Sequence, residues 1–382
     1  MLLAAGAVIP VLVWIYLLFL RGGFWRISKQ FAPADLPTPT AKRIAVVIPA
    51  RNEANAIAQA LTSLFHQQFP SPIHIFLVDD NSVDRTAEIA ATAAERAGKL
   101  DSLTIIRGQP LSAGWTGKPW ALSQGIAEAE KHAPDYLLLT DADIVHGPNT
   151  TEELVAIAEA GRYDLTSYMV KLACTSAAEK ALIPAFLFFF LKLYPPRWIT
   201  SPNHKAAGAA GGCILLRPDA LRRIGGLTTI RNEVIDDCAL AREIKRTGGR
   251  IWMGLTSTVY SVRSYRTFHE IGRMVSRTAF KQLRHSPLLL AAVLLGLFFT
   301  YVLPPLLLLT GRPAEIVLGL LAWAMMSTAY LPASRFYTRS IAWSLSLPLV
   351  ACFYMGATLR SAFQYWKGVG GEWKGRVQDA RS

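Results

Sequence analysis

The strongest chemical signal in the sequence is a pair of aspartates separated by one residue. Asp141 and Asp143 follow the apolar run Leu137–Leu139, so we expect them to lie where a buried strand ends. Two carboxylates at this spacing can converge on one hard cation, such as Mg²⁺ or Mn²⁺, that also binds substrate phosphates. A turn with aspartate caps would give the same triplet. The place at a strand end favours a site for a divalent cation.

A second acidic pair, Asp79 and Asp80, follows the apolar run Ile73–Val78. A carboxylate pair facing a crevice can accept hydrogen bonds from a nucleobase edge and from a ribose. The competing interpretation is local, because Ser82 or Asp84 is well placed to cap the helix that follows. Both interpretations can hold together.

Two further groups of residues could bind a nucleotide. Pro49, Arg51 and Glu53 follow the first predicted strand and could hold the sugar and phosphate of a nucleotide, or simply begin a solvated helix. Lys118 follows Gly117 at a predicted helix start, where a diphosphate is favourably bound.

A third acidic pair, Asp236 and Asp237, opens a predicted helix that runs to about Arg246. The pair could be helix caps, or it could supply the general base that takes a proton from an acceptor hydroxyl. Upstream, the run Ala206–Gly212 contains only alanine and glycine, so a ligand or another backbone segment can approach it closely.

The segment Tyr265–Arg284 is amphipathic and basic, and it precedes the C-terminal apolar runs. A juxtamembrane helix on anionic lipid would account for most of its charge, while at least one arginine could reach a diphosphate leaving group. Its cations are Arg266, Arg273, Arg277, Lys281 and Arg284.

Buried strands alternating with helices would position these groups. Such alternation predicts an α/β domain with a mostly parallel sheet, in which ligands bind beyond the carboxyl ends of the strands. The acidic pairs fall at those ends. The predicted strands are Arg43–Pro49, Ile73–Val78, Leu103–Arg107 and Tyr136–Leu139, and the predicted helices are Glu53–Phe65, Thr86–Ala97 and Trp120–Lys131.

Apolar runs near both ends predict membrane helices. Leu2–Leu20 is uncharged and about as long as a bilayer requires, so we expect an anchor over residues 1–22 rather than a cleaved signal peptide. Ala181–Trp198 is apolar but contains proline and lysine, which favours a shallow interfacial helix over a span. Three C-terminal runs bring the expected spans to four: Pro287–Leu309, Ile316–Leu331 and Ile341–Leu359.

The net charge of +13 does not indicate a nucleic-acid partner, because many cations flank the apolar runs as they do in cytoplasmic loops. We therefore expect a multi-pass protein of the cytoplasmic (inner) membrane with a cytosolic catalytic domain over 41–285, helices over 286–360 and a basic tail over 361–382. Four spans would place that tail outside, whereas its cations prefer the inside, so one segment could be re-entrant.

The motifs, in this order, resemble family 2 glycosyltransferases of the GT-A fold, which have a Rossmann-like sheet. The matching stretches are VVIPARNE, VDDNS, TGKPWALSQG, TDAD, AAGGCILLRPDAL and IDDCALA, between Val46 and about Arg284. The sequence resembles the hopanoid-associated HpnB group more closely still. The stretches that carry this resemblance are GWTGKPWALSQG, LLLTDADIVHGP and IPAFLFFFLKLYPP.

The resemblance implies a role for each acidic pair. Asp79 and Asp80 would bind the nucleobase and ribose, Asp141 and Asp143 would hold a divalent metal and the diphosphate, and Asp237 would be the general base. Processive members carry a (Q/R)xxRW motif, of which only Arg277 is present here. The missing tryptophan suits transfer of a single sugar to a lipid.

The expected activity is inverting transfer of one sugar from a UDP- or GDP-sugar to a membrane lipid hydroxyl, with a hopanoid as the acceptor that the resemblance suggests. A polyprenyl-phosphate sugar synthase is the first alternative, and its phosphate acceptor needs no base. A non-catalytic membrane scaffold that binds nucleotide sugars is the second.

Overall fold

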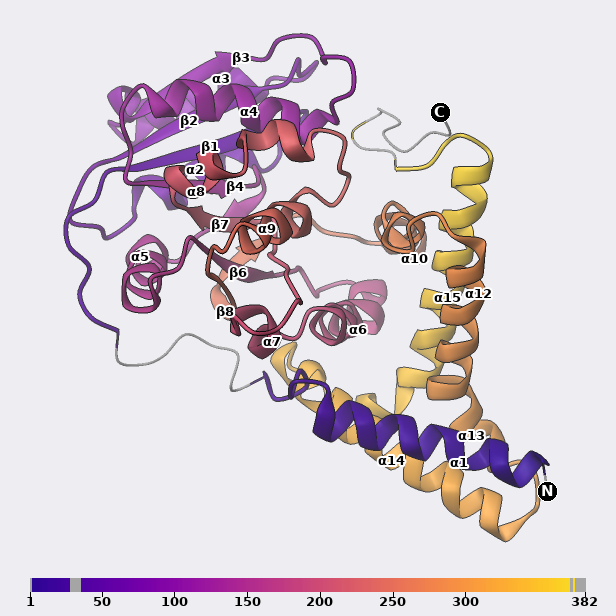
Figure 1. The fold of residues 1–382 in the computed structure, drawn as a ribbon. Helices are drawn as coiled ribbons and strands as arrows, with labels where there is room; N and C mark the ends of the chain where they lie inside the picture. Colours follow the sequence, from indigo (N-terminus) through magenta and orange to yellow (C-terminus); the bar gives the residue numbers. More distant parts are fainter. Residues whose placement is uncertain (1, 28–35, 372–373, 375–382) are drawn as a thin grey trace. The chain divides into compact units, whose positions relative to one another are not determined.

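The computed structural model describes residues 2–27, 36–371 and 374, and contacts divide the chain into two compact units (Figure 1). The sheet unit comprises Gln30–Ala173 and Trp198–Arg263. The helical unit comprises Met1–Lys29, Cys174–Arg197 and Ser264–Ser382, so the basic segment after residue 263 groups with the apolar helices.

One sheet of eight strands lies at the centre of the sheet unit in the described residues, in the order β3-β2-β1-β4-β7-β6-β8-β5. Neighbours within β3-β2-β1-β4 are parallel, as are β6 and β8, whereas β7 is antiparallel to β4 and β6, and β5 to β8. The α/β prediction and its four strands are confirmed. The strands are β1 (Ile44–Ala50), β2 (Ile73–Asp79), β3 (Leu103–Arg107), β4 (Tyr136–Thr140), β5 (Ile144–Val145), β6 (Leu165–Lys171), β7 (Cys213–Leu216) and β8 (Ile251–Ser261).

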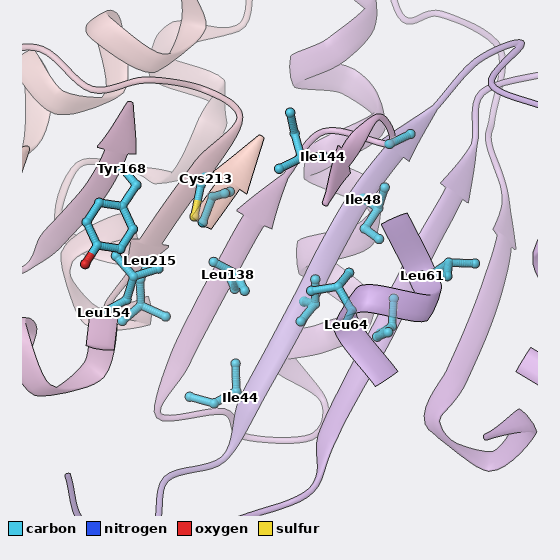
Figure 2. Close-up of a cluster of buried hydrophobic side chains, with 14 of the residues drawn as sticks. Ile44, Ile48, Leu61, Leu64, Leu138, Ile144, Leu154, Tyr168, Cys213 and Leu215 are labelled. Carbon is cyan, nitrogen blue, oxygen red and sulfur yellow. The ribbon is translucent and has the colours of Figure 1, made fainter. Parts of the chain in front are cut away.

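Helices cover both faces of the sheet, which is why β1 and β4 are buried along their whole length. On one face α2 (Ile57–Phe65) and α5 (Thr150–Gly161) pack on the strands, and Figure 2 shows Leu61, Leu64 and Leu154 in the same buried cluster as Leu138. On the other face α4 (Gly117–Glu130) approaches so closely that a Cβ on Gly125 would lie 2.5 Å from Cγ1 of Val47.

Strands β1 and β4 separate at their carboxyl ends. Their pairing ends at Val47 and Leu139, whereas β1 continues beside β2 as far as Ala50 and Asp79. The chain runs outward from β1 to β3 and then crosses to β4 on the other side of β1. This change of direction opens a crevice of the kind in which α/β sheets bind ligands.

The remaining helices of the sheet unit are α3 (Thr86–Arg96), α8 (Pro218–Arg223) and α9 (Asp236–Arg246), while α7 (Pro196–Thr200) lies where the chain passes between units. The helical unit contains α1 (Leu2–Ile15), α6 (Ala177–Leu193), α10 (Phe268–Ser276), α11 (Ala279–Gln282), α12 (Pro287–Leu297), α13 (Leu303–Leu307), α14 (Pro313–Phe336) and α15 (Leu347–Trp366).

Three helical stretches in the described part of the chain are long and apolar enough to cross a membrane: Pro287–Leu307, Pro313–Phe336 and Ile341–Trp366. They confirm three long apolar helices at the predicted C-terminal positions, while their crossing of a membrane stays a prediction. The expected N-terminal span is corrected, because the apolar helix Gly6–Leu20 falls short of a full-length span. It packs on α14, and Nε1 of Trp14 donates a 2.9 Å hydrogen bond to the carbonyl of Thr300.

The apolar segment predicted over residues 181–198 is part of α6 only as far as Leu193, and α7 begins at Pro196. Helix α6 packs against α10, α14 and α15. It begins at a capping box formed by Ser176 and Glu179. The Glu179 carboxylate is fully buried and accepts five hydrogen bonds, from the backbone N–H groups of Thr175, Ser176 and Tyr265 and from the hydroxyls of Thr175 and Ser264. Although burial opposes its ionisation, these donors lower the pKa of Glu179 to about 2.

Candidate active site

A lysine joins three carboxylates at the carboxyl edge of the sheet. Lys118, in the first turn of α4, places Nζ 2.7 Å from Oδ1 of Asp141, which follows β4. The same Nζ lies 3.7 Å from Oδ2 of Asp236 at the start of α9. Asp237, the next residue, adds a third negative charge that acts on this lysine. Three acidic or basic segments predicted separately from the sequence therefore meet in one cluster.

Asp237 is held in place by two backbone N–H groups. Its Oδ2 accepts a 2.7 Å hydrogen bond from Gly211, and its Oδ1 accepts one of the same length from Cys238. A Cβ on Gly211 would lie 3.0 Å from Nζ of Lys118, so the close approach expected of the Ala206–Gly212 run occurs here. Glycine allows the backbone to orient Asp237 beside the lysine.

A buried hydroxyl holds the same glycine segment from the sheet side. Oγ1 of Thr140 donates a 2.8 Å hydrogen bond to the carbonyl of Gly212. This bond uses the only hydroxyl proton of Thr140. In the 2.9 Å hydrogen bond between Thr140 and His146, the donor must therefore be Nε2 of the histidine. Burial lowers the pKa of His146 to about 4, so the ring is neutral at physiological pH.

Burial and the neighbouring charged side chains determine the protonation states of the residues in this cluster. Burial and the neighbouring Asp236 raise the pKa of Asp237 to about 6, against the opposing effect of Lys118 and the two backbone donors. Burial and Asp143 likewise raise the pKa of Asp141. Burial disfavours the charge of Lys118, yet Asp141 and Asp236 raise its pKa above the ordinary value. At neutral pH the lysine is charged and Asp237 is ready to exchange a proton.

The second aspartate of the pair, Asp143, is bonded differently. Its Oδ2 accepts a 2.7 Å hydrogen bond from the hydroxyl of Ser261 and a 3.1 Å bond from Nε of Arg263. Nη2 of Arg263 also reaches Glu53, at 2.6 Å from Oε1 and 2.8 Å from Oε2. Arg263 therefore joins the carboxylate after β4 to the carboxylate after β1.

The residues at the end of β2 and directly after it form several local hydrogen bonds. Asp80 is almost fully buried, and its backbone carbonyl accepts a 2.6 Å hydrogen bond from Nη1 of Arg51. Oδ1 of Asp79 accepts a bond from Ser82 N–H at 3.0 Å, and Oδ1 of Asp84 accepts one from the N–H at the start of α3 at 3.1 Å. Of the two expected capping residues, Asp84 therefore bonds the first residue of α3, while Asp79 closes the turn that precedes this helix.

Pro49 and Arg277 are two further residues that were predicted to contact a nucleotide sugar. Pro49 lies in β1 opposite Val78, just beyond the last pair that β1 makes with β4. Arg277 ends α10 in the helical unit, where its backbone N–H bonds the carbonyls of Arg273 and Val275. Their proposed contacts with a nucleotide sugar stay predictions.

A pocket beside the lysine cluster is polar at one side and apolar at the other. Lys118, Gly211, Asp236 and Asp237 form the polar side. The apolar side comes from α4, α9 and the 3-10 turn Gly226–Ile230, together with two strand residues: Pro119, Leu122, Leu139, Ile214, Leu227, Ile230 and Leu240.

The donor set fits a divalent cation only together with a substrate. The described residues contain no group of three or more histidine, cysteine, aspartate or glutamate side chains placed to hold a metal. Asp141 and Asp143 supply two carboxylates, and Mg²⁺ or Mn²⁺ commonly takes its remaining ligands from substrate phosphates and water. The metal assignment of these two residues stays a prediction.

Arg263 and Ser261 were not predicted from the sequence. Arg263 lies 120 residues after Asp143 and 210 residues after Glu53, and no local pattern connects them. The only sequence feature that marks Arg263 is its position just after the long strand β8.

Comparison with known proteins finds a family match for the first part of the chain. Residues 45–225 match the family described as Glycosyl transferase family 2. The probable glycosyltransferase YdaM of Bacillus subtilis is 31% identical over 160 residues, which is 37% of this chain and 33% of that protein. The undecaprenyl-phosphate 4-deoxy-4-formamido-L-arabinose transferase of Serratia proteamaculans is 30% identical over 126 residues, 32% and 36% of the two chains. The chain thus matches about a third of the length of these relatives.

A solved structure shares the fold over most of the chain. The mannosyltransferase PcManGT from Pyrobaculum calidifontis, solved with GDP-Man and Mn²⁺, has a TM-score of 0.54 and 18% sequence identity. The match covers 95% of this chain and 99% of that chain. It supports the GT-A-like arrangement of the sheet unit.

Proposed function

We propose that this chain, which is a family 2 glycosyltransferase, transfers one sugar from a UDP- or GDP-sugar to a hydroxyl of a membrane lipid with inversion at the anomeric carbon. The observation that carries the proposal is the cluster of Lys118 with Asp141, Asp236 and Asp237 at the open edge of the sheet. It supplies a base of raised pKa and a cation within a few ångströms of each other.

The transfer is a single displacement. The acceptor oxygen forms a bond to the anomeric carbon as the bond from that carbon to the nucleotide diphosphate breaks, and the acceptor proton passes to Asp237. Gly211 and Cys238 orient that carboxylate through their N–H groups. Lys118 stabilises the negative charge that develops on the leaving diphosphate.

Asp141 and Asp143 would hold the divalent cation together with the diphosphate oxygens. The bound cation would supply additional stabilisation of the leaving group's charge. Asp80 would accept hydrogen bonds from the nucleobase or ribose at the neighbouring strand end, with Arg51 fixing its backbone. Pro49, Glu53 and Asp79 would line the same crevice, and Arg277 would bind the diphosphate.

The three helices long enough to span a membrane support a lipid acceptor. Two relatives support it by name, the Serratia transferase for undecaprenyl phosphate and the 4,4'-diaponeurosporenoate glycosyltransferase of Staphylococcus haemolyticus, which is 35% identical over 105 residues, 28% of this chain and 25% of that protein. A hopanoid is the specific acceptor we propose, on the motif resemblance alone. The positive charge beside the apolar runs favours a cytosolic sheet unit.

Mass spectrometry of lipids from cells with the gene, without it and with Asp237→Asn tests the proposal. We expect a lipid that is heavier by one sugar only when the intact gene is present. The mass difference names the sugar, and the mass of the parent lipid names the acceptor. Identical lipid profiles in all three strains, with the protein present in the membrane, would overturn it.

A polyprenyl-phosphate sugar synthase is the second candidate, favoured by the name of the Serratia relative. Its acceptor is a phosphate that needs no base at neutral pH. Asp237→Asn would then lose little activity with a polyprenyl phosphate, which separates the two functions in a single assay.

A further inference from the structure

Each aspartate expected to hold the divalent cation is already bonded to a cation of the protein. Asp141 pairs with Lys118 at 2.7 Å, and Asp143 pairs with Arg263 at 3.1 Å. Asp143 is only 8% exposed, so water screens this second pair little. Each carboxylate of the pair thus has a cationic side chain of the sheet unit as its partner before any metal arrives.

Arg263 is held in this position by more than Asp143. Its Nη2 donates to both oxygens of Glu53, a side chain that is itself mostly buried. Its backbone N–H donates a 3.1 Å bond to Oγ of Ser261, the same hydroxyl that donates to Oδ2 of Asp143. The guanidinium group is therefore fixed beside the metal carboxylate at two points.

A divalent cation that arrives alone must compete with Lys118 and Arg263 for the two carboxylates. It would have to approach Asp143 against the positive charge of Arg263, in surroundings with little water to screen the repulsion. A nucleoside diphosphate changes this balance, because guanidinium and ammonium groups form charge-assisted hydrogen bonds with phosphate oxygens. As Arg263 and Lys118 turn toward the diphosphate, the two carboxylates become available to the cation.

We propose that Arg263 couples metal binding to nucleotide binding by holding Asp143 until a nucleoside diphosphate takes over the guanidinium group. Arg263 is a positioning residue for the metal carboxylate, and Glu53 is the second contact that keeps it near the crevice. The inference rests on the proposed function, since it takes a nucleoside diphosphate and a divalent cation as the ligands of this site.

Binding of Mn²⁺ to the purified full-length chain in detergent tests the inference, with free Mn²⁺ followed by electron paramagnetic resonance. In the wild type we expect weak binding of Mn²⁺ alone and much tighter binding when UDP or GDP is added. In Arg263→Gln we expect Mn²⁺ alone to bind about tenfold more tightly, and the gain from the nucleotide to shrink by a similar factor.

Arg222→Gln is the matched control. Arg222 also pairs with two carboxylates, Asp219 and Glu130, but it is exposed on α8 away from the crevice. We expect this variant to bind Mn²⁺ as the wild type does. Equal tightening in both variants would show a general effect of charge and would overturn the inference.

Arg263→Gln leaves Glu53 buried without its guanidinium partner, which could unfold the unit. The double variant Glu53→Gln/Arg263→Gln removes both charges of this pair and tests the same prediction without a buried Glu53 carboxylate, with circular dichroism to establish folding. Unchanged Mn²⁺ affinity in a folded variant, with the wild type still responding to nucleotide, would overturn the role of Arg263 alone. A wild type that binds no Mn²⁺ with either nucleotide would overturn the proposed function as well.

Discussion

Asp237 in the sheet unit is a half-buried carboxylate and Glu179 in the helical unit is a fully buried one, and their surroundings differ in kind. Asp237 receives two backbone hydrogen bonds but lies beside Asp236, and its pKa rises to about 6. Glu179 receives five hydrogen bonds from neutral donors, and its pKa falls to about 2. Near neutral pH Asp237 can therefore gain or lose a proton, whereas Glu179 stays ionised.

The largest effect should come from removing the reactive carboxylate. Asp237→Asn should reduce sugar transfer about 10³-fold, because no base then takes the acceptor proton. The free energy of unfolding should change by only about 1 kcal/mol, since one lost hydrogen bond is offset by relief from Asp236. Transfer rates, donor affinity and thermal midpoints check this. Asp219→Asn, also in the first turn of a helix, is the control.

The next largest effect should come from removing the positive charge of Lys118, which lies among the carboxylates. Lys118→Gln should reduce transfer about 10²-fold through loss of charge stabilisation at the leaving group. It should also raise the pKa of Asp237, because Lys118 lowers that pKa. The acid limb of the pH–rate profile should therefore move to higher pH. Lys131→Gln at the other end of α4 should leave both quantities unchanged.

Glu179→Gln should act on stability instead of chemistry. We expect the helical unit to lose about 2–3 kcal/mol, since several donors lose a charged acceptor. Because the folded pKa of Glu179 is lowered, its contribution is complete above the ordinary value of 4.5 and is lost as pH falls toward about 2. Denaturation in detergent across this range measures it.

The second capping box of the same unit provides the control for that variant. Glu270 caps α10 through Thr267 but is only half-buried and accepts fewer bonds. Glu270→Gln should cost well under half as much as Glu179→Gln. Equal losses at the two positions would show that burial and the number of donors do not explain the behaviour of Glu179.

The smallest effect is the pH dependence of the unaltered chain. With a free-enzyme pKa of about 6 for Asp237, kcat/KM should fall about tenfold for each pH unit below 6 and level off above 7. Rates measured with saturating divalent cation check the slope. A flat profile between pH 5 and 8 would remove Asp237 from the role of base.

The positions of the acidic pairs could be predicted because each depends on local pattern. A buried run ending in Asp79 or Asp141 marks the end of a strand, and parallel strands bring such ends to one edge. Gly211 belongs to a run of small residues that signals close approach, and it does lie against Lys118. The sequence therefore contained most of the lysine cluster.

Other features depend on contacts that no local pattern records. Arg263 belongs to the site because β8 lies in the same sheet as β5, the short strand that directly follows Asp143. The mixed half of the sheet, from β5 to β8, was not predicted, since β5 and β7 are short.

The packing of α6 has a consequence for how the chain is made. This apolar helix leaves the ribosome well before α10, α14 and α15, the helices that cover it. At about 5–20 residues per second, its apolar face stays without those partners for on the order of ten seconds. During synthesis the helix must rest against lipid or a chaperone, so its sequence has to suit two successive environments. Substitutions in α6 could thus reduce the yield of protein without changing the activity of the molecules that mature.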